Sequence, residues 1–133
     1  MHKILVVEDE RSLRLLYQQE LERDGYVVAT AATAKEGLAL VDSENPDLVV
    51  LDIRMPGMDG LDAMSRILER HAQMKVVLNS AYSSYKDNFM SWAADAYVVK
   101  SSDLTELRST IKQLLSGSPA GAAAAPPRRP PPA

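Results

Sequence analysis

Short apolar runs alternate with longer stretches of helical spacing along most of this chain of 133 residues. Five of the runs are rich in β-branched side chains and end at charged or turn-forming residues, which predicts strands. The predicted strands cover residues 4–7, 26–30, 48–51, 75–78 and 97–99. The run at 48–51 is apolar at every position, so we expect a central strand buried on both faces of a parallel sheet.

The segments between the predicted strands carry apolar residues three or four positions apart, which indicates amphipathic helices. Helices are predicted at about residues 13–24, 34–42, 61–68 and 104–114, with a shorter and weaker one at 83–92. Ser12, Thr33 and Asp103 are predicted to cap three of these helices, and Gly25 is predicted to end the first.

Strands that alternate with helices throughout a chain favour right-handed βαβ units, and therefore an α/β fold with helices on both faces of a parallel sheet. From Ser116 onward the sequence changes to Gly, Ala, Pro and Arg. Such a segment has too little apolar bulk to offset the entropy of ordering it. We therefore expect one domain over residues 1–116 and a disordered tail with polyproline II character over residues 117–133.

Composition narrows the class of protein. The formal net charge is −3, and neither a basic stripe nor aromatics among lysines marks a nucleic-acid surface. The chain has no cysteine, which excludes disulfides and thiolate metal sites and fits a reducing compartment. The first residues do not resemble a signal peptide, and no apolar run is long enough to cross a bilayer. We expect a cytoplasmic domain without membrane insertion or direct nucleic-acid contact.

The predicted strand ends carry the residues with the most chemistry. Parallel strands bring their carboxyl ends to one edge of the sheet, where open α/β sheets place ligand sites. The residues gathered there are Glu8, Asp9, Asp52, Ser80 and Lys100. Two carboxylates about 5 Å apart repel by roughly 3 kcal/mol at an effective dielectric of 20, so a cation is needed nearby. An oxygen-rich cluster without Cys or His suits Mg²⁺ or Mn²⁺.

A metal ion, a carboxylate, a hydroxyl and an ammonium are the parts of a phosphoryl-transfer site. The chain contains neither a P-loop nor a G-x-G-x-x-G loop, so we expect the phosphoryl group to come from a small donor or from another protein. A solvated acidic rim is the simpler alternative. It does not explain why a hydroxyl and an ammonium stand at separate strand ends beside the acids.

Four motifs give the chain a resemblance to a known family. They are Ile4-Leu5-Val6-Val7-Glu8-Asp9-Glu10, the stretch from Leu51 to Gly60, Ser80-Ala81, and Tyr97-Val98-Val99-Lys100. In this order and spacing they resemble the receiver domain of two-component response regulators, over about residues 3–115. The resemblance implies a doubly wound, flavodoxin-like (βα)5 fold with strand order 2-1-3-4-5. The region around residues 91–101 resembles stand-alone receivers that pair with sensor kinases.

The resemblance also implies roles for individual residues. Asp52 would accept a phosphoryl group from a phosphohistidine of a sensor histidine kinase or a histidine phosphotransfer protein. Ser80 and Lys100 would hold the phosphoryl oxygens. Ser80 and Tyr97 would then change position and carry the signal to a downstream protein target. The domain would catalyse only its own phosphorylation and slow dephosphorylation, and would otherwise not be an enzyme.

The same resemblance implies a metal site for Mg²⁺ or Mn²⁺. Asp9 and Asp52 would bind the ion, Glu8 would act directly or through water, and Arg54 would supply its backbone carbonyl.

The sequence departs from the family pattern in several places. Glu8 replaces the usual Asp and Ser80 the commoner Thr, and both keep the required oxygen. Lys100 is followed by Ser101 instead of a Pro that takes a cis bond in the family. A cis bond before Ser costs roughly 3 kcal/mol, so that bond is either strained or the loop is rearranged. Residues 93–94 are both Ala where a helix-ending Gly is usual.

Three other functions fit part of the pattern. A phosphatase of the haloacid dehalogenase type needs a second Asp two residues after Asp52, where this chain has Arg54. A flavodoxin-like cofactor binder needs a phosphate loop after the first strand, where Glu8 and Asp9 would repel phosphate without a metal. A degenerate receiver that acts only as a protein-interaction module is the third. Four intact residues speak against it, Asp9, Asp52, Ser80 and Lys100, whereas Ser101 in place of the usual Pro keeps it open.

Overall fold

The computed structural model describes residues 2–53, 57–81, 94–101 and 103–116. These residues form five strands and four helices, which alternate as predicted from β1 to β4. The strands are β1 (Lys3–Val7), β2 (Val27–Ala31), β3 (Leu48–Leu51), β4 (Lys75–Ser80) and β5 (Ala96–Val99). The helices are α1 (Arg11–Arg23), α2 (Ala34–Glu44), α3 (Gly60–Arg70) and α4 (Thr105–Ser116).

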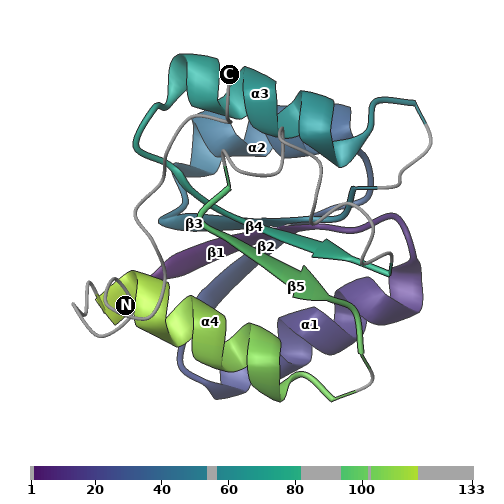
Figure 1. Cartoon of the computed structure of the whole chain (residues 1–133), viewed down its shortest axis with the longest axis vertical. Helices are drawn as coiled ribbons and strands as arrows, with labels where there is room; N and C mark the ends of the chain where they lie inside the picture. Colours follow the sequence, from purple (N-terminus) through teal and green to yellow (C-terminus); the bar gives the residue numbers. More distant parts are fainter. Residues whose placement is uncertain (1, 54–56, 82–93, 102, 117–133) are drawn as a thin grey trace, which may run out of the picture.

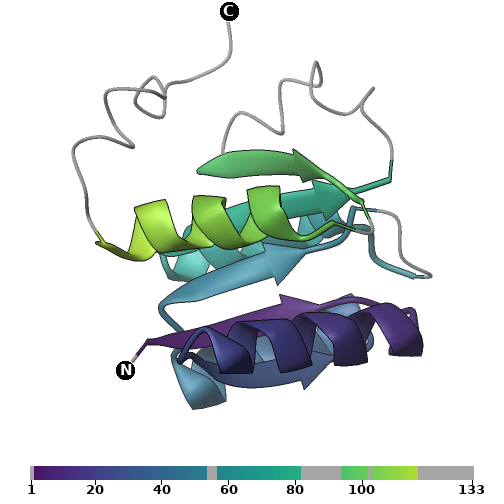
Figure 2. The same ribbon diagram turned by 90° about the horizontal axis from the view of Figure 1, so that it is seen from below.

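All neighbouring strands pair in parallel, in the order β2-β1-β3-β4-β5. The sheet lies between two helical layers, with α2 and α3 on one face and α1 and α4 on the other (Figures 1 and 2). This is the doubly wound α/β architecture that the sequence predicted. The strand order reverses between β1 and β3, which makes the edge beyond these two strands the expected ligand site.

Each face of the sheet packs against its helices through an apolar layer of its own. Successive residues of a strand point to opposite faces, so one strand contributes to both layers. In β3, Val49 lies in the layer under α2 and α3, whereas Val50 lies in the layer under α1 and α4. Every residue of β3 is at most 2% exposed, which confirms the prediction of a central strand buried on both sides.

The element boundaries differ slightly from the predicted ones. The largest difference among the strands is in β4, which runs two residues further than predicted and includes Asn79 and Ser80. These two polar residues stay in the strand because they pair with Val98 and Val99 of β5. Because both residues are polar, the sequence pattern predicted that the strand would end before them, although β5 continues beside them.

Two of the three predicted helix caps are confirmed. The Thr33 side chain accepts a hydrogen bond from the Glu36 amide, and the Asp103 side chain accepts one from the Thr105 amide. The cap at Ser12 was wrong. Helix α1 begins at Arg11, with a cap residue before it whose side chain makes no capping bond, so Ser12 lies inside the first turn.

The first helix ends near the predicted glycine. Its last residue is followed by Asp24 in a helical conformation and by Gly25 at φ +97°, a left-handed conformation in which glycine has no steric penalty.

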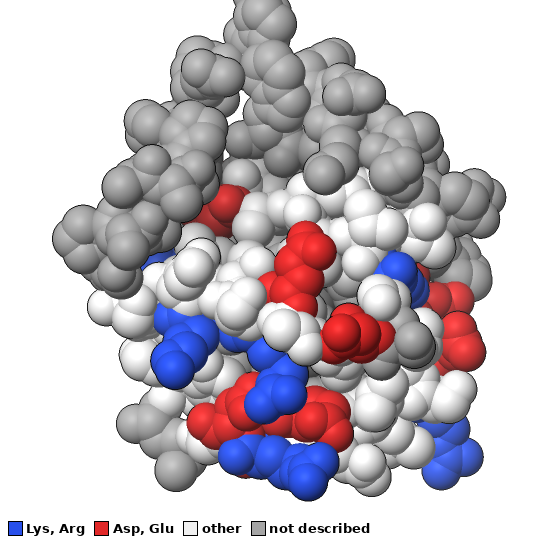
Figure 3. All heavy atoms as spheres, turned by 60° about the horizontal axis from the view of Figure 1, so that its bottom comes forward, with Lys and Arg blue, Asp and Glu red and all other residues white. Residues whose placement is uncertain are grey.

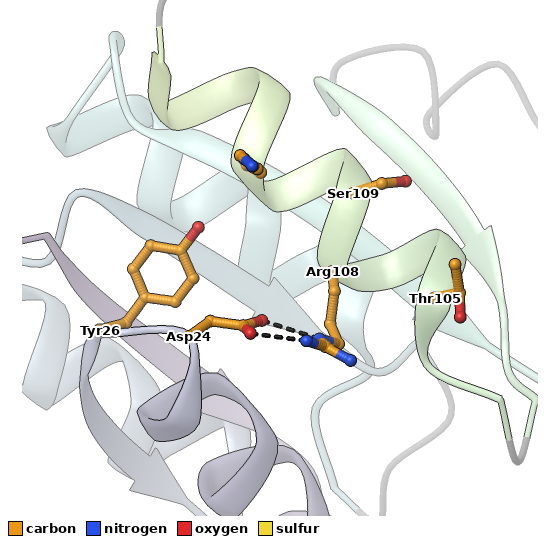
Figure 4. A pocket seen from close by; sticks show the side chains of 6 residues that line it. Asp24, Tyr26, Thr105, Arg108 and Ser109 are labelled. Carbon is orange, nitrogen blue, oxygen red and sulfur yellow. Dashed lines mark hydrogen bonds and ion pairs between the residues drawn. The ribbon is translucent and has the colours of Figure 1, made fainter.

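A bidentate ion pair joins α4 to Asp24, the residue that follows α1. The Arg108 guanidinium donates to both carboxylate oxygens of Asp24, at 2.8 and 2.6 Å (Figure 4). Acidic and basic side chains stand close together across this side of the molecule (Figure 3).

Among the described residues, no helix has both the length and the apolar character of a membrane span. The predicted helix at 83–92, the tail at 117–133 and residue Arg54 lie outside the described residues.

Candidate functional site

Four strands end at one edge of the sheet and bring the five predicted residues to it. Residues Val7 and Leu51 are partners in the pairing of β1 with β3, so Glu8 and Asp52 are the next residues on these two strands. The Asp52 amide donates to the Val7 carbonyl at 3.1 Å, which keeps the two strand ends together. Register therefore sets the spacing of the acids.

Three carboxylates form the acidic part of the site. Glu8, Asp9 and Asp52 each offer one oxygen, and these oxygens lie within 4.8 Å of one another. Glu8 is 2% exposed and Asp52 is 6% exposed, whereas Asp9 faces solvent. Each pair of negative charges at 4.8 Å repels by about 3.5 kcal/mol at an effective dielectric of 20. The fold therefore holds like charges together at an appreciable electrostatic cost.

One ammonium group lies between two of these acids. Lys100 Nζ is 2.6 Å from Glu8 Oε1 and 3.2 Å from Asp52 Oδ2. Burial favours the neutral amine, but the two carboxylates outweigh it and raise the pKa of Lys100. Lys100 is thus fully charged at neutral pH. Three carboxylates against one ammonium leave a formal charge of −2 when all four groups are ionised.

The two carboxylate oxygens of Glu8 have different neighbours. Its Oε2 accepts a hydrogen bond from the Glu10 amide at 3.1 Å. Its Oε1 is buried and forms an ion pair with the Lys100 ammonium at 2.6 Å. Burial raises the pKa of Glu8, and the hydrogen bonds and charge of its neighbours offset only part of that effect. A cation near Oε1 would favour the ionised form.

The donor set fits a hard divalent cation. Mg²⁺ prefers carboxylate and carbonyl oxygens and keeps several water ligands, so it needs few protein groups and an opening to solvent. Here two buried carboxylates supply fixed oxygens, and the exposed Asp9 leaves one side of the cluster open to water. No ligand nitrogen or sulfur is present in the cluster, which disfavours Zn²⁺.

The remaining predicted residues lie on β4 and β5. Ser80 is the last residue of β4 and is fully buried, and its carbonyl accepts a hydrogen bond from the Lys100 amide at 2.7 Å. Tyr97 is half-buried and packs against the layer under α2 and α3. The Lys100–Ser101 bond is trans, since the described residues contain no cis peptide bond. The strained cis bond, one of the two alternatives for this loop, is therefore not present.

Two residues that support the site were missed in the sequence. Arg14 on α1 donates to the carbonyl oxygens of Glu8 and Asp9, at 2.8 and 3.3 Å, and so holds the loop that carries both acids. Gly60 begins α3 directly against the backbone of Asp52, where a Cβ atom would come within 2.8 Å of the Asp52 carbonyl carbon. The position of Gly60, directly after the capping residue Asp59, was a sequence signal for such close packing. No sequence signal indicated the role of Arg14.

Comparisons with known proteins agree with this geometry. The profile of the response regulator receiver domain matches residues 4–112. The chain is 34% identical over 118 residues to the alkaline phosphatase synthesis transcriptional regulatory protein PhoP of Bacillus subtilis. That match covers 87% of this chain and 49% of PhoP, so the chain spans about half the length of this relative. It is 31% identical over 115 residues to sporulation initiation phosphotransferase F of the same species, covering 85% of this chain and 93% of the relative.

Solved structures give the same family. The response regulator protein TrrA of Thermotoga maritima, in complex with Mg²⁺-BeF, has a TM-score of 0.83 and 45% identity. The comparison covers 86% of this chain and 99% of TrrA. TrrA in complex with the histidine kinase ThkA has a TM-score of 0.82 at the same identity and coverage. The profile, the relatives and the shared fold agree, and the chain belongs to the family of response regulator receiver domains.

Proposed function

We propose that this receiver accepts a phosphoryl group on Asp52 from a phosphohistidine of a sensor histidine kinase or a histidine phosphotransfer protein. The observation that carries the proposal is the convergence of three groups that are far apart in the sequence. Asp52 lies 3.2 Å from the Lys100 ammonium and within 4.8 Å of the Glu8 and Asp9 carboxylates. A nucleophile, a cation and a metal-binding acid pair are the parts that this transfer requires.

Asp52 would act as the nucleophile. One of its carboxylate oxygens attacks phosphorus, and the bond from phosphorus to the histidine nitrogen breaks as the new bond to oxygen forms. The histidine ring leaves with the electron pair of the broken bond and takes up a proton from water. The buried carboxylate has few solvating waters to lose before it attacks.

Lys100 and Ser80 would stabilise the charge on the transferred group. The ammonium already lies beside Asp52, so it is in place before the phosphoryl group arrives and needs little reorganisation. The Ser80 hydroxyl would donate to a second phosphoryl oxygen. A bound Mg²⁺ would neutralise negative charge on the phosphoryl oxygens, and Glu8, Asp9, Asp52 and the Arg54 carbonyl would hold it.

The comparisons support the donor and the metal by analogy. TrrA is described in complex with Mg²⁺-BeF and, separately, with the histidine kinase ThkA. We extend both to this chain: Mg²⁺ as the cofactor and a histidine kinase as the partner. The acidic cluster supports the first extension independently, because its donor set suits Mg²⁺.

Phosphorylation would be read by other proteins. The contact between Ser80 and the phosphoryl group would exist only in the phosphorylated form. It would therefore favour one of two conformations of the domain, which differ in the positions of Ser80 and Tyr97. The output would be a contact with a downstream protein in the cytoplasm. We propose neither direct nucleic-acid binding nor enzymatic turnover of a separate substrate.

The test is phosphorylation by a small donor. Acetyl phosphate with Mg²⁺ is expected to add the mass of one phosphoryl group to the wild-type chain, and Asp52→Asn is expected to abolish it. Asp62→Asn, which changes an exposed aspartate on α3, is the matched control and should be labelled normally. Labelling of the Asp52→Asn variant at the wild-type rate would place the acceptor elsewhere and refute the proposal.

A further inference from the structure

A tyrosine and an asparagine form a hydrogen bond inside the apolar layer beneath the site. Tyr17 on α1 is 1% exposed, and Asn79 near the end of β4 is 3% exposed. The Asn79 amide nitrogen donates to the Tyr17 hydroxyl oxygen at 3.1 Å. Burying a hydroxyl and an amide is unfavourable unless they are hydrogen-bonded, and apolar side chains could fill the same space without that requirement. The pair therefore needs an explanation beyond packing.

The position of Asn79 in the sheet connects the pair to the site. Leu51 of β3 pairs with Leu78 of β4, so Asp52 and Asn79 are the next residues in the same register. They therefore stand side by side at the edge of the sheet where the acids gather. Ser80, which would donate to the phosphoryl group, follows Asn79 directly in the chain. A shift of the Asn79 backbone would move Ser80 with it.

The charged residues of the site also act on the Tyr17 hydroxyl. Burial raises the pKa of the Tyr17 hydroxyl, the bond from Asn79 lowers it, and the charges of Lys100, Glu8 and Asp52 act on it as well. The hydroxyl thus lies in the electric field of the charged cluster, on the side toward α1.

Helix α1 is attached to the metal-binding loop at a second point. Arg14 donates to the carbonyls of Glu8 and Asp9, as described above. Arg14 and Tyr17 are three residues apart, and residues at this spacing are neighbours on one side of a helix. One helix therefore holds both the loop that carries two of the acids and the strand end that carries Ser80.

We propose that the Tyr17–Asn79 hydrogen bond positions the Ser80 hydroxyl for phosphoryl transfer to Asp52. Tyr17 and Asn79 are positioning residues that act through Ser80. The bond fixes the last residues of β4 against α1, at the point where the chain leaves the sheet. Hydrogen bonds to a transferred group depend steeply on geometry, and a misplacement of about 1 Å can slow a reaction by up to about a hundredfold. This inference rests on the function proposed above.

The experiment is a double-mutant cycle between Tyr17 and Ser80. Tyr17→Phe removes the hydroxyl and keeps the ring that fills the core. The rate of phosphorylation by acetyl phosphate at saturating Mg²⁺ is expected to fall by about fivefold in Tyr17→Phe. In the Ser80→Ala background, the same change is expected to have almost no effect on the rate, because the hydroxyl that it positions is absent. Asn79→Leu is expected to reproduce the Tyr17→Phe result.

Two further measurements separate positioning from a general loss of structure. The affinity for Mg²⁺, measured by calorimetry, should stay within about twofold of wild type in Tyr17→Phe, because Arg14 still holds the metal-binding loop. Tyr26→Phe is the matched control, since its ring lines the groove between Asp24 and α4, whose lining includes none of Glu8, Asp9 and Asp52 (Figure 4). It should be phosphorylated at the wild-type rate.

Either of two results would overturn the inference. An equal slowing by Tyr17→Phe with and without the Ser80 hydroxyl would show that Tyr17 acts on something else. A wild-type rate in Tyr17→Phe would show that the bond does not matter for transfer. Both results leave the proposed function intact as long as wild type is phosphorylated on Asp52. Failure of wild type to be phosphorylated would refute the function and this inference together.

Discussion

Removing the charge of Asp52 should make the metal-free protein more stable. The oxygens of Glu8, Asp9 and Asp52 lie at most 4.8 Å apart, so at an effective dielectric of 20 each of the other two acids repels the Asp52 carboxylate by at least about 3.5 kcal/mol. Lys100, at 3.2 Å, attracts it by about 5 kcal/mol on the same scale. Among these charges, the two repulsions exceed the attraction by at least about 2 kcal/mol. Asp52→Asn keeps the shape of the side chain, so we expect the free energy of unfolding to rise by about 1–2 kcal/mol.

Magnesium should reverse part of this difference. An ion that binds only the folded state stabilises it by about 1.4 kcal/mol at ten times its dissociation constant. Wild type has all three carboxylates and should gain this increment. Asp52→Asn has lost one of them and should gain less. The stability gap between the two proteins is therefore expected to narrow, or to disappear, as Mg²⁺ is added.

The assay is urea denaturation followed by circular dichroism, with chelator and then with increasing Mg²⁺. Glu69→Gln, which neutralises an exposed glutamate on α3, controls for the change in net charge and should leave the stability nearly unchanged. The reasoning fails if Asp52→Asn is no more stable than wild type in chelator. It also fails if Mg²⁺ stabilises wild type and the variant equally.

Three further predictions follow from single contacts. Gly60→Ala should destabilise the fold by about 1–3 kcal/mol and slow phosphorylation, measured by denaturation and by mass, because its Cβ would displace the backbone of Asp52. Burial raises the pKa of Glu8, so the Mg²⁺ affinity measured by calorimetry should begin to fall at a pH above the ordinary value of 4.5 as the pH is lowered, and Glu8→Gln should reduce this dependence. The hydrogen bond from Arg108 lowers the pKa of Asp24 in the folded protein. The pair should therefore stabilise the fold at pH values above 3.8, the ordinary pKa of Asp. This stabilisation should be lost as the pH falls through the lower pKa that Asp24 has in the folded state. At low salt, Arg108→Ala should remove the part of the fall in melting temperature at acid pH that this pair causes. At high salt, screening should make the two proteins behave alike.

Much of the fold could be predicted because local patterns and tertiary structure agree in this chain. The apolar run at residues 48–51 is buried on both faces, as a central parallel strand must be. Thr33 and Asp103 cap helices because their side chains bond an amide two or three residues on, which is a local property. The cap predicted at Ser12 was wrong because α1 begins at Arg11, so Ser12 is already inside the helix.

The acidic cluster could be predicted because topology alone brings it together. Once the strands are parallel, the residues that follow them must meet at one edge, whatever their order in the chain. The predicted convergence of Asp9, Asp52 and Lys100 needed no side-chain detail, since each residue directly follows its strand or lies within two residues of it. The supporting contacts did need that detail. Nothing in the sequence connects Arg14 with the carbonyls that it binds, or Tyr17 with Asn79, which is 62 residues away.

The same register that makes the site predictable also explains why it responds to ligands. The backbone hydrogen bonds between β1 and β3 keep the strand ends that carry Glu8 and Asp52 side by side. Their repulsion is therefore stored in the folded state, and Lys100 relieves only part of it. A cation that joins the cluster removes a larger share, and a phosphoryl group on Asp52 changes the charge again. The apolar layers on both faces of the sheet contain none of these charged residues, so a cation or a phosphoryl group changes the charge of the cluster without changing the composition of the core.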